Sequence, residues 1–206
     1  MKNFHRAAAW SILALLLASQ VRASDLYTID PAHTSIVFSV AHSGFSYTYG
    51  MFRKATGSYV IDKANGANSK FRLSIDASSL DTNNQERDKH LRSADFFNVQ
   101  QFPDITFETT RCSASNTQDG IIYQLTGNLT IHGVTKQVSV PLRMLGEGPG
   151  PYKDQRTGFL CQIELKRTDF GMSNLLENNL VGDAVGITVS FEGIMQAPGS
   201  APAAAQ

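Results

Sequence analysis

Apolar and polar residues alternate along most of this 206-residue chain. Residues 70–76, for example, read KFRLSID. Successive side chains of a β-strand point to opposite faces, so this period of two predicts strands with one apolar and one solvent-exposed face. The same alternation recurs over 123–131, 138–144, 159–166 and 185–195. Less regular strands are expected over 33–42, 50–62 and 104–112.

About eight long strands follow from this pattern, joined mostly by short polar turns. Antiparallel strands with one apolar face can bury that face by closing into a barrel, and a closed barrel has no unpaired edge strand. The sequence therefore predicts an all-β fold, an eight-stranded antiparallel lipocalin-like barrel with room for side chains or one slim ligand. A change of phase near Arg53 and Lys54 predicts a β-bulge. Gly57, Gly127 and Gly193 lie inside strand patterns, where they would let the sheet bend.

One polar segment, TNNQERDKHLRSADFF (residues 82–97), interrupts the strands. Thr82 and Gln85 fit a capping box, so we expect a helix over about 83–92 beside the barrel mouth. Leu91 is its only large apolar residue, and a helix that is polar nearly all round lies on the surface. We interpret its charges as ion pairs that hold it against the barrel rim. Three phenylalanines are expected to anchor its far end, Phe96, Phe97 and Phe102.

Both ends of the chain differ from the barrel in composition. Residues 1–23 combine a short basic start with the apolar run AAAWSILALLLA (Ala7–Ala18) and small residues before a cut near Ala23. These features predict a secretory signal peptide, and hence a periplasmic or secreted protein without stable membrane insertion after cleavage. The barrel would then occupy 24–195, and 196–206 would be a disordered tail.

The charge balance bears on possible partners. The predicted signal peptide holds three of the 18 basic residues and none of the 18 acidic ones, which gives the remaining chain a net charge of −3. So mild a charge gives no support for binding to nucleic acid or to an anionic membrane surface.

Four blocks of sequence carry a family resemblance: DPAHTSIVFSVAHSGFSYTYGMF (Asp30–Phe52), DTNNQERDKHLRSADFFNVQQFPDITF (Asp81–Phe107), LTGNLTIHGVTKQVSV (Leu125–Val140) and LKRTDFGM (Leu165–Met172). Together they closely resemble the YceI-like family of secreted bacterial lipid-binding proteins. The resemblance implies an extended lipocalin-like barrel that carries a lipid, needs no cofactor and is not an enzyme. Its tunnel would bind a polyisoprenoid, a quinone or a fatty-acid derivative. Many members of the family are homodimers, so a homodimer is possible here.

The residues themselves also favour a lipid tunnel. Phe, Leu, Ile and Val occupy the apolar strand faces, and aromatic residues of the segment 42–52 gather at the first strand turn. An aromatic mouth suits an amphiphile with its tail inside and its head outside. Burial of each tail methylene contributes about 0.8 kcal/mol before ordering costs. The predicted ligand-binding residues are Phe38, Val40, His42, Phe45, Tyr47, Tyr49, Phe52, Leu73, Ile75, Phe107, Leu125, Leu129, Ile131, Phe159, Ile163 and Phe191.

Two other functions stay open. A lipid-modifying hydrolase or isomerase would use His42 or His90 as its base, and a solid-cored structural barrel would bind no ligand. His90 and Glu86, four residues apart on the predicted helix, form an ordinary surface pair, so we expect no catalytic residues.

The spacing of the histidines and cysteines bears on metal binding and on a possible disulfide. The histidines show no HxH or HExxH spacing and the cysteines no CxxC spacing, so we expect no metal site. Cys112 and Cys161 are either a disulfide of an exported protein or two separate thiols, and the predicted strand order does not make them neighbours.

Overall fold

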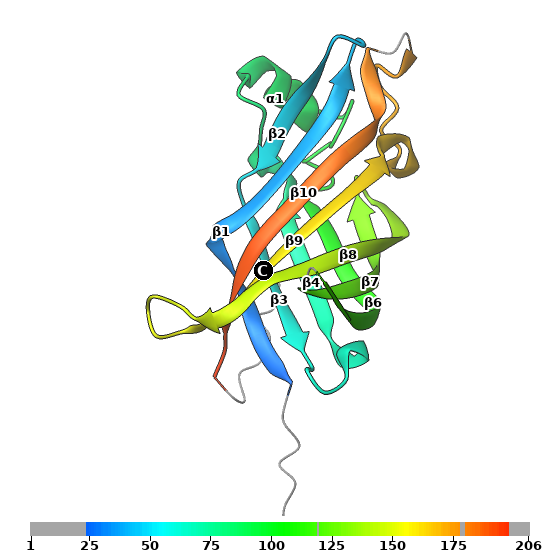
Figure 1. Ribbon diagram of the computed structural model, residues 1–206. Helices are drawn as coiled ribbons and strands as arrows, with labels where there is room; N and C mark the ends of the chain where they lie inside the picture. Colours follow the sequence, from blue (N-terminus) through cyan, green and yellow to red (C-terminus); the bar gives the residue numbers. More distant parts are fainter. Residues whose placement is uncertain (1–23, 119, 178–179, 198–206) are drawn as a thin grey trace, which may run out of the picture.

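The computed structural model describes residues 24–118, 120–177 and 180–197 (Figure 1). The predicted signal peptide (1–23) and residues 198–206 of the predicted tail lie outside the described residues. The strands are β1 (Asp25–His42), β2 (Ser46–Phe52), β3 (Ala55–Ile61), β4 (Lys70–Asp76), β5 (Leu80–Asp81), β6 (Asp104–Thr117), β7 (Gly120–Ile131), β8 (Val134–Pro149), β9 (Gln155–Lys166) and β10 (Val181–Met195). The helices are α1 (Gln85–Arg92) and the short 3-10 helices η1 (Gly66–Asn68), η2 (Ala77–Ser79) and η3 (Arg167–Phe170).

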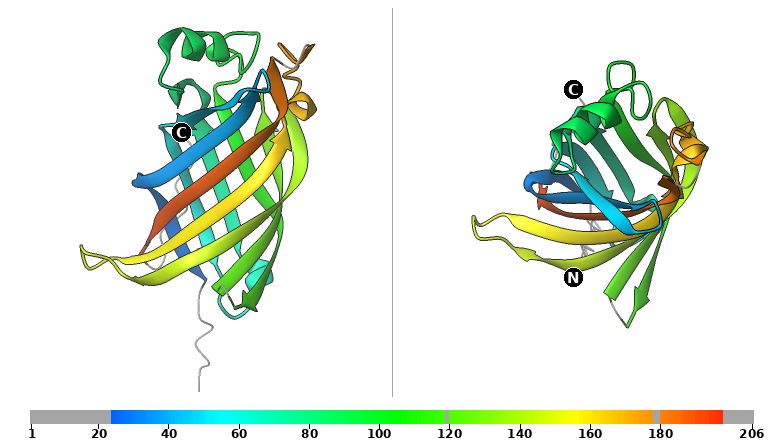
Figure 2. Two further views of the ribbon diagram at one scale, coloured as in Figure 1. Left: turned by 45° about the horizontal axis from the view of Figure 1, so that its top comes forward. Right: turned by 90° about the horizontal axis from the view of Figure 1, so that it is seen from above.

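The strands close into one antiparallel barrel (Figures 1 and 2). Their order is β10-β9-β8-β7-β6-β4-β3-β1-β2-β5, and β1 also pairs with β10. The first part of β1 pairs with β3 and the second part with β2, so β2 and β3 share one place in the wall. The barrel thus has eight strand positions, which confirms the predicted lipocalin-like fold.

The expected bulge near Arg53 and Lys54 is a complete interruption between β2 and β3. The backbone N–H of Arg53 donates to the Ser79 carbonyl, and the Asp76 N–H donates to the Lys54 carbonyl. The Arg53 guanidinium lies 2.6 Å from the Asp81 carboxylate. The strand is broken because the segment around η2 and β5 takes up the hydrogen-bonding groups that a continuous ladder would use.

The strand glycines make room for inward side chains. At Gly127 a Cβ atom would lie 2.5 Å from the Phe107 ring, and at Gly193 it would lie 1.9 Å from the Tyr59 hydroxyl. Both separations are far below van der Waals contact, so only glycine fits under these rings.

The interior has two halves, named here by the ends of the barrel. The filled end holds a solid core of Tyr27, Ile29, Tyr59, Ile61, Phe71, Cys112, Tyr123, Leu125, Leu142, Phe159, Cys161 and Phe191. The helix end is the opposite end, where α1, η3 and the β1–β2 turn lie (Figures 1 and 2). A second cluster of buried residues gathers there: Ile36, Ala55, Ile75, Ala77, Ile105, Leu129, Ile131, Phe170 and Met172.

The helix begins two residues later than expected, and its cap is different. Asn84 is the N-cap, and its side chain accepts from the Arg87 N–H at 3.0 Å. Thr82 is buried, and its N–H and hydroxyl donate to the Asp88 carboxylate at 2.9 and 2.5 Å. The capping box of Thr82 with Gln85 is therefore wrong, because Asp88 already satisfies the Thr82 donors.

Of the helices in the described ranges, none is long and apolar enough to cross a bilayer.

Candidate functional site

An apolar cavity of about 220 Å³ occupies the helix end of the barrel. Its wall consists of inward side chains from β1, β2, β4 and β6 to β10, together with residues of α1, η3 and the loops beside them. Nearly all of the atoms that face the cavity are carbon. The solid core of the filled end closes the cavity on that side. The interior is thus hollow in one half, unlike the solid-cored barrel considered above.

Eleven of the predicted ligand-binding residues lie together in the cavity wall. They are Phe38, Val40, Phe52, Leu73, Ile75, Phe107, Leu125, Leu129, Ile131, Ile163 and Phe191. Their strands bring them to one face because each occupies an inward position of the alternation. Contact of these residues with a ligand stays a prediction.

The structure places the other five outside the wall. Phe159 faces inward but lies in the solid core, with none of its surface exposed. His42 is exposed at the end of β1, and Phe45 is 92% exposed in the turn that follows. Of the predicted aromatic mouth, Phe52 lines the cavity, whereas Phe45, Tyr47 and Tyr49 do not.

The register between β1 and β2 explains why two tyrosines face outward. Tyr47 pairs with Ala41 and Tyr49 pairs with Ser39. Paired residues of neighbouring strands share a face. Phe38 and Val40 face the cavity, so Ala41, Ser39 and their tyrosine partners face solvent, and both tyrosines are 64% exposed.

The helix end of the wall contains residues that the predicted site omitted. Leu91 of α1 and the following Phe96 and Phe97 line the cavity, as do Phe170 and Met172 beyond β9. Phe96 and Phe97 were expected only as anchors of the helix. These residues lie between strands, where no alternation indicates which way a side chain faces; their apolar character inside polar segments was the only available signal.

Hydrogen bonds hold α1 on the rim. The Arg92 Nε donates to the Ser78 carbonyl at 2.8 Å, and its Nη2 donates to the Leu80 carbonyl. Arg87 donates through Nε and Nη2 to the hydroxyl and carbonyl of Thr82, both at 2.7 Å. The expected ion pairs to the barrel are wrong: within the described ranges, the one contact of α1 with a carboxylate of another segment, apart from backbone and Thr82 contacts, joins the His90 ring to nearby Asp95 at 3.0 Å. The backbone of residues 78–82 supplies acceptors closer to the arginines than any barrel carboxylate.

A buried arginine holds together the part of the rim formed by η3 and the start of β10. Arg167, at the start of η3, is 6% exposed and donates to four backbone carbonyls at 2.8–2.9 Å. The acceptors belong to Met172, Asn174, Val181 and Gly182. Burial lowers the pKa of this guanidinium, and nearby Asp183 opposes the shift. The side chain thereby joins residues 172–174 to the start of β10, beside the cavity.

Neither histidine considered as a base lines the cavity. His42 and His90, the two histidines considered as bases, are exposed and are not part of the wall. Cys161 lines the cavity, but burial raises the pKa of its thiol to about 11, so it is neutral at physiological pH. Cys161 and Cys112 are separate, buried thiols. The thiol that faces the cavity is therefore not activated as a nucleophile.

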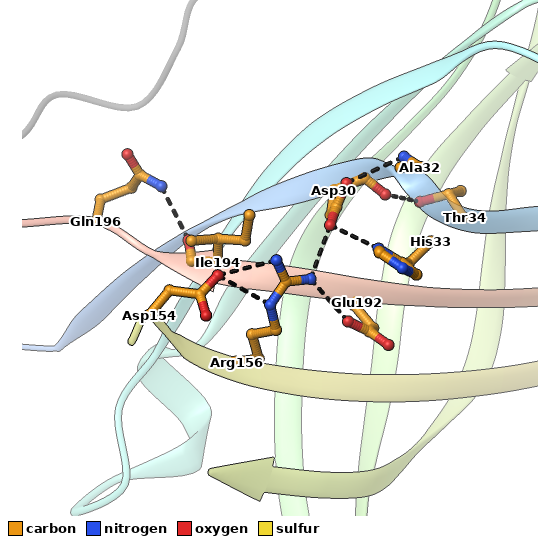
Figure 3. Close-up of polar contacts among 9 residues, drawn as sticks. All are labelled: Asp30, Ala32, His33, Thr34, Asp154, Arg156, Glu192, Ile194 and Gln196. Atoms are coloured by element: carbon orange, nitrogen blue, oxygen red, sulfur yellow. Dashed lines mark hydrogen bonds and ion pairs between the residues drawn. The ribbon is translucent and has the colours of Figure 1, made fainter. Parts of the chain in front are cut away.

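A polar cluster joins three strands on the outer face of the barrel (Figure 3). Arg156 of β9 donates from Nη1 to Asp30 of β1 at 2.7 Å and to Glu192 of β10 at 2.8 Å, and it also binds Asp154. His33 lies 2.8 Å from the same oxygen of Asp30. Ligand atoms of Asp30, His33 and Glu192 lie within 4.8 Å of one another, but the guanidinium already serves as their cation. The cluster therefore clamps the irregular part of β1 to β9 and β10.

A closed eight-stranded barrel with an apolar cavity at one end defines a lipocalin-like protein. Residues 27–193 match the family model of the YceI-like domain. The chain is 40% identical to UPF0312 protein PA0423 of Pseudomonas aeruginosa over 185 aligned residues. The alignment covers 89% of this chain and 93% of that protein. The chain belongs to the YceI-like family.

Solved structures share the fold. BcnA of Burkholderia cenocepacia aligns with a TM-score of 0.70 at 23% identity, over 80% of this chain and 98% of that one. A polyisoprenoid binding domain from Saccharophagus degradans, implicated in plant cell wall breakdown, aligns with a TM-score of 0.61 at 15% identity. That alignment covers 82% of this chain and 98% of the domain.

Proposed function

We propose that the protein binds a long-chain amphiphilic lipid, a polyisoprenoid, a quinone or a fatty-acid derivative, and carries or sequesters it without chemical change. The observation that carries the proposal is the cavity at the helix end, whose wall is almost entirely carbon. Each methylene buried there contributes about 0.8 kcal/mol, so a chain can bind without polar recognition. The description of the Saccharophagus degradans neighbour as a polyisoprenoid binding domain supports this choice of ligand class.

The polar head group of such a ligand stays at or outside the helix end. Burial of a polar group without a hydrogen-bonding partner costs a few kcal/mol, and the wall offers almost no polar atom to serve as that partner. The tail consequently enters first and points toward the filled end. Export to the periplasm or medium is part of the proposal, supported by the composition of residues 1–23. A homodimer stays a prediction from the family resemblance.

A charge placed in the wall tests the proposal. Leu129 lines the cavity, and the preceding residue of β7, Asn128, is exposed on the opposite face. We expect Leu129→Asp to lower the occupancy of added polyprenol at least tenfold in native mass spectrometry. An apolar tail in the cavity would remove water from the new carboxylate, which costs free energy. Asn128→Asp adds the same charge on the outer face of the barrel, and this variant should bind polyprenol like the wild type.

Phe38→Asp provides a second wall variant at a less buried position. Melting curves recorded beforehand identify the variants that fold. Folded Leu129→Asp or Phe38→Asp protein that takes up polyprenol as tightly as the wild type would contradict tail binding in this cavity.

A further inference from the structure

The cavity ends on a floor made by residues that belong both to its wall and to the solid core. The five buried residues with this double membership are Phe71, Leu125, Leu142, Cys161 and Phe191. A tail that enters at the helix end runs along the wall until it meets them. Beyond the floor, the core cluster fills the interior.

Two more rings support the floor from behind. Phe159, with no exposed surface, stacks on Phe191 at a centroid distance of 5.3 Å and meets Phe71 edge-on at 5.7 Å. Tyr59 stacks on Phe71 at 5.2 Å. Because protein interiors are close-packed, neither floor ring can recede without displacing a ring behind it.

Tyr59 is itself fixed on several sides. It lies between Phe71 and Tyr27, whose ring centroid is 5.0 Å away at an interplanar angle of 8°. Its hydroxyl hydrogen-bonds to the hydroxyl of Thr157, which is 1% exposed. Gly193 leaves the space that this hydroxyl occupies. The support of the floor is therefore rigid in both packing and hydrogen bonding.

We infer that this aromatic floor limits the length of tail that the barrel accepts, so the protein selects among amphiphiles by tail length. The inference rests on the proposed function and adds the determinant of specificity. The wall is nearly all carbon, so it excludes polar groups but offers no polar contact that would distinguish one apolar tail from another. Affinity instead rises up to about fourfold for each methylene that fits, the equivalent of about 0.8 kcal/mol, and stops rising when the tail reaches Phe71 and Phe191.

The experiment offers an equimolar mixture of straight-chain primary alcohols, from octanol to eicosanol, to detergent-free protein and compares their occupancies by native mass spectrometry. In the wild type, we expect occupancy to rise by up to about fourfold per methylene to a limiting length and then to level off or fall. Phe191→Ala should move this limit to longer chains, since the removed ring deepens the cavity. Phe191→Leu, a smaller change that endangers folding less, should move it in the same direction.

Phe97→Ala is the matched control, because Phe97 lines the cavity at the helix end. It should weaken binding without moving the limiting length. A limit unchanged in both Phe191 variants, or the absence of any limit in the wild type, would overturn the floor as the determinant of length. Wild-type protein that takes up none of the alcohols and no polyprenol would instead contradict the proposed function itself.

Discussion

Arg167 and Asp88 are the charged side chains with the least exposure among the described residues, 6% and 7%, and neither has an ion-pair partner. Backbone carbonyls surround Arg167, and the N–H and hydroxyl of Thr82 bind Asp88. A buried charge is stable only if its hydrogen-bonding capacity is met, which these polar neighbours achieve. Both residues lie in segments that contribute to the cavity wall, so their hydrogen bonds hold parts of that wall in place.

Replacement of Arg167 by Met should strongly destabilise the fold. Four backbone carbonyls would lose their donor, and each buried acceptor left unpaired costs about 1–3 kcal/mol, although water entering the rim recovers part of that. We expect a loss of at least about 2 kcal/mol in urea unfolding. Arg111 is exposed, and Arg111→Met should stay within about 0.5 kcal/mol of the wild type. Equal unfolding midpoints for the two variants would show that the carbonyls do not depend on Arg167.

The acid stability of the barrel should depend on Asp30. Hydrogen bonds from His33, the largest cause, and from Arg156 lower the pKa of this carboxyl from 3.8 to about 2, against the opposing effect of burial. A lowered pKa in the folded state stabilises the protein above the unfolded-state pKa, and this stabilisation is lost as the pH falls from about 4 to about 2.

Asp30→Asn isolates this contribution from those of other carboxyls. The variant should be less stable than the wild type at pH 7, and the gap in unfolding free energy should close between about pH 4 and pH 2. Urea unfolding across this pH range measures the gap. A constant gap would show that ionisation of Asp30 is not linked to folding.

The helix α1 contributes one wall residue, Leu91, and is held to the barrel by polar contacts with residues 78–82. Elements attached by few apolar contacts open locally at a lower free energy than the core. The helix is therefore the part of the wall most suited to move when a ligand enters or leaves.

Asp88→Ala should loosen α1 without unfolding the barrel. The change removes the carboxylate that accepts from the N–H and hydroxyl of Thr82, and hydrogen bonds to charged groups contribute about 1.5–3 kcal/mol. Hydrogen exchange of residues 85–92 should accelerate at least tenfold, whereas exchange in β7 and β9 should not change. Glu86→Ala is the control, because Glu86 is exposed on the same helix. Equal acceleration in both variants would assign the effect to the loss of an acidic side chain from the first turn of the helix, not to the contact with Thr82.

The limits of prediction from sequence are clear in β2 and α1. Alternation predicts which residues of β2 share a face, but the pairing of Tyr49 with Ser39 and of Tyr47 with Ala41 decides that this face is the outer one. That register depends on a second strand and cannot be derived from β2 alone. Similarly, TNNQ is compatible with a cap at Thr82, but the hydrogen bonds of Thr82 to Asp88, six residues further on, leave Asn84 as the cap.

For the molecule as a whole, the closed barrel was predictable because each long strand has one apolar face that requires burial. The division of the interior into a solid and a hollow half was not. Phe, Leu and Ile occur in both halves, and Phe159 and Phe107 cannot be told apart by sequence pattern. The volume left unfilled depends on how strands and connecting segments converge, which is why the wall residues of α1 and η3 were missed.

Native mass spectrometry of the protein purified without detergent, followed by solvent extraction and identification of the released lipid, tests the proposed function most directly. We expect a near-stoichiometric complex that releases an isoprenoid, quinone or acyl compound. Protein that is purified empty, and that stays empty when polyprenyl and acyl lipids are added, would contradict lipid binding in the barrel.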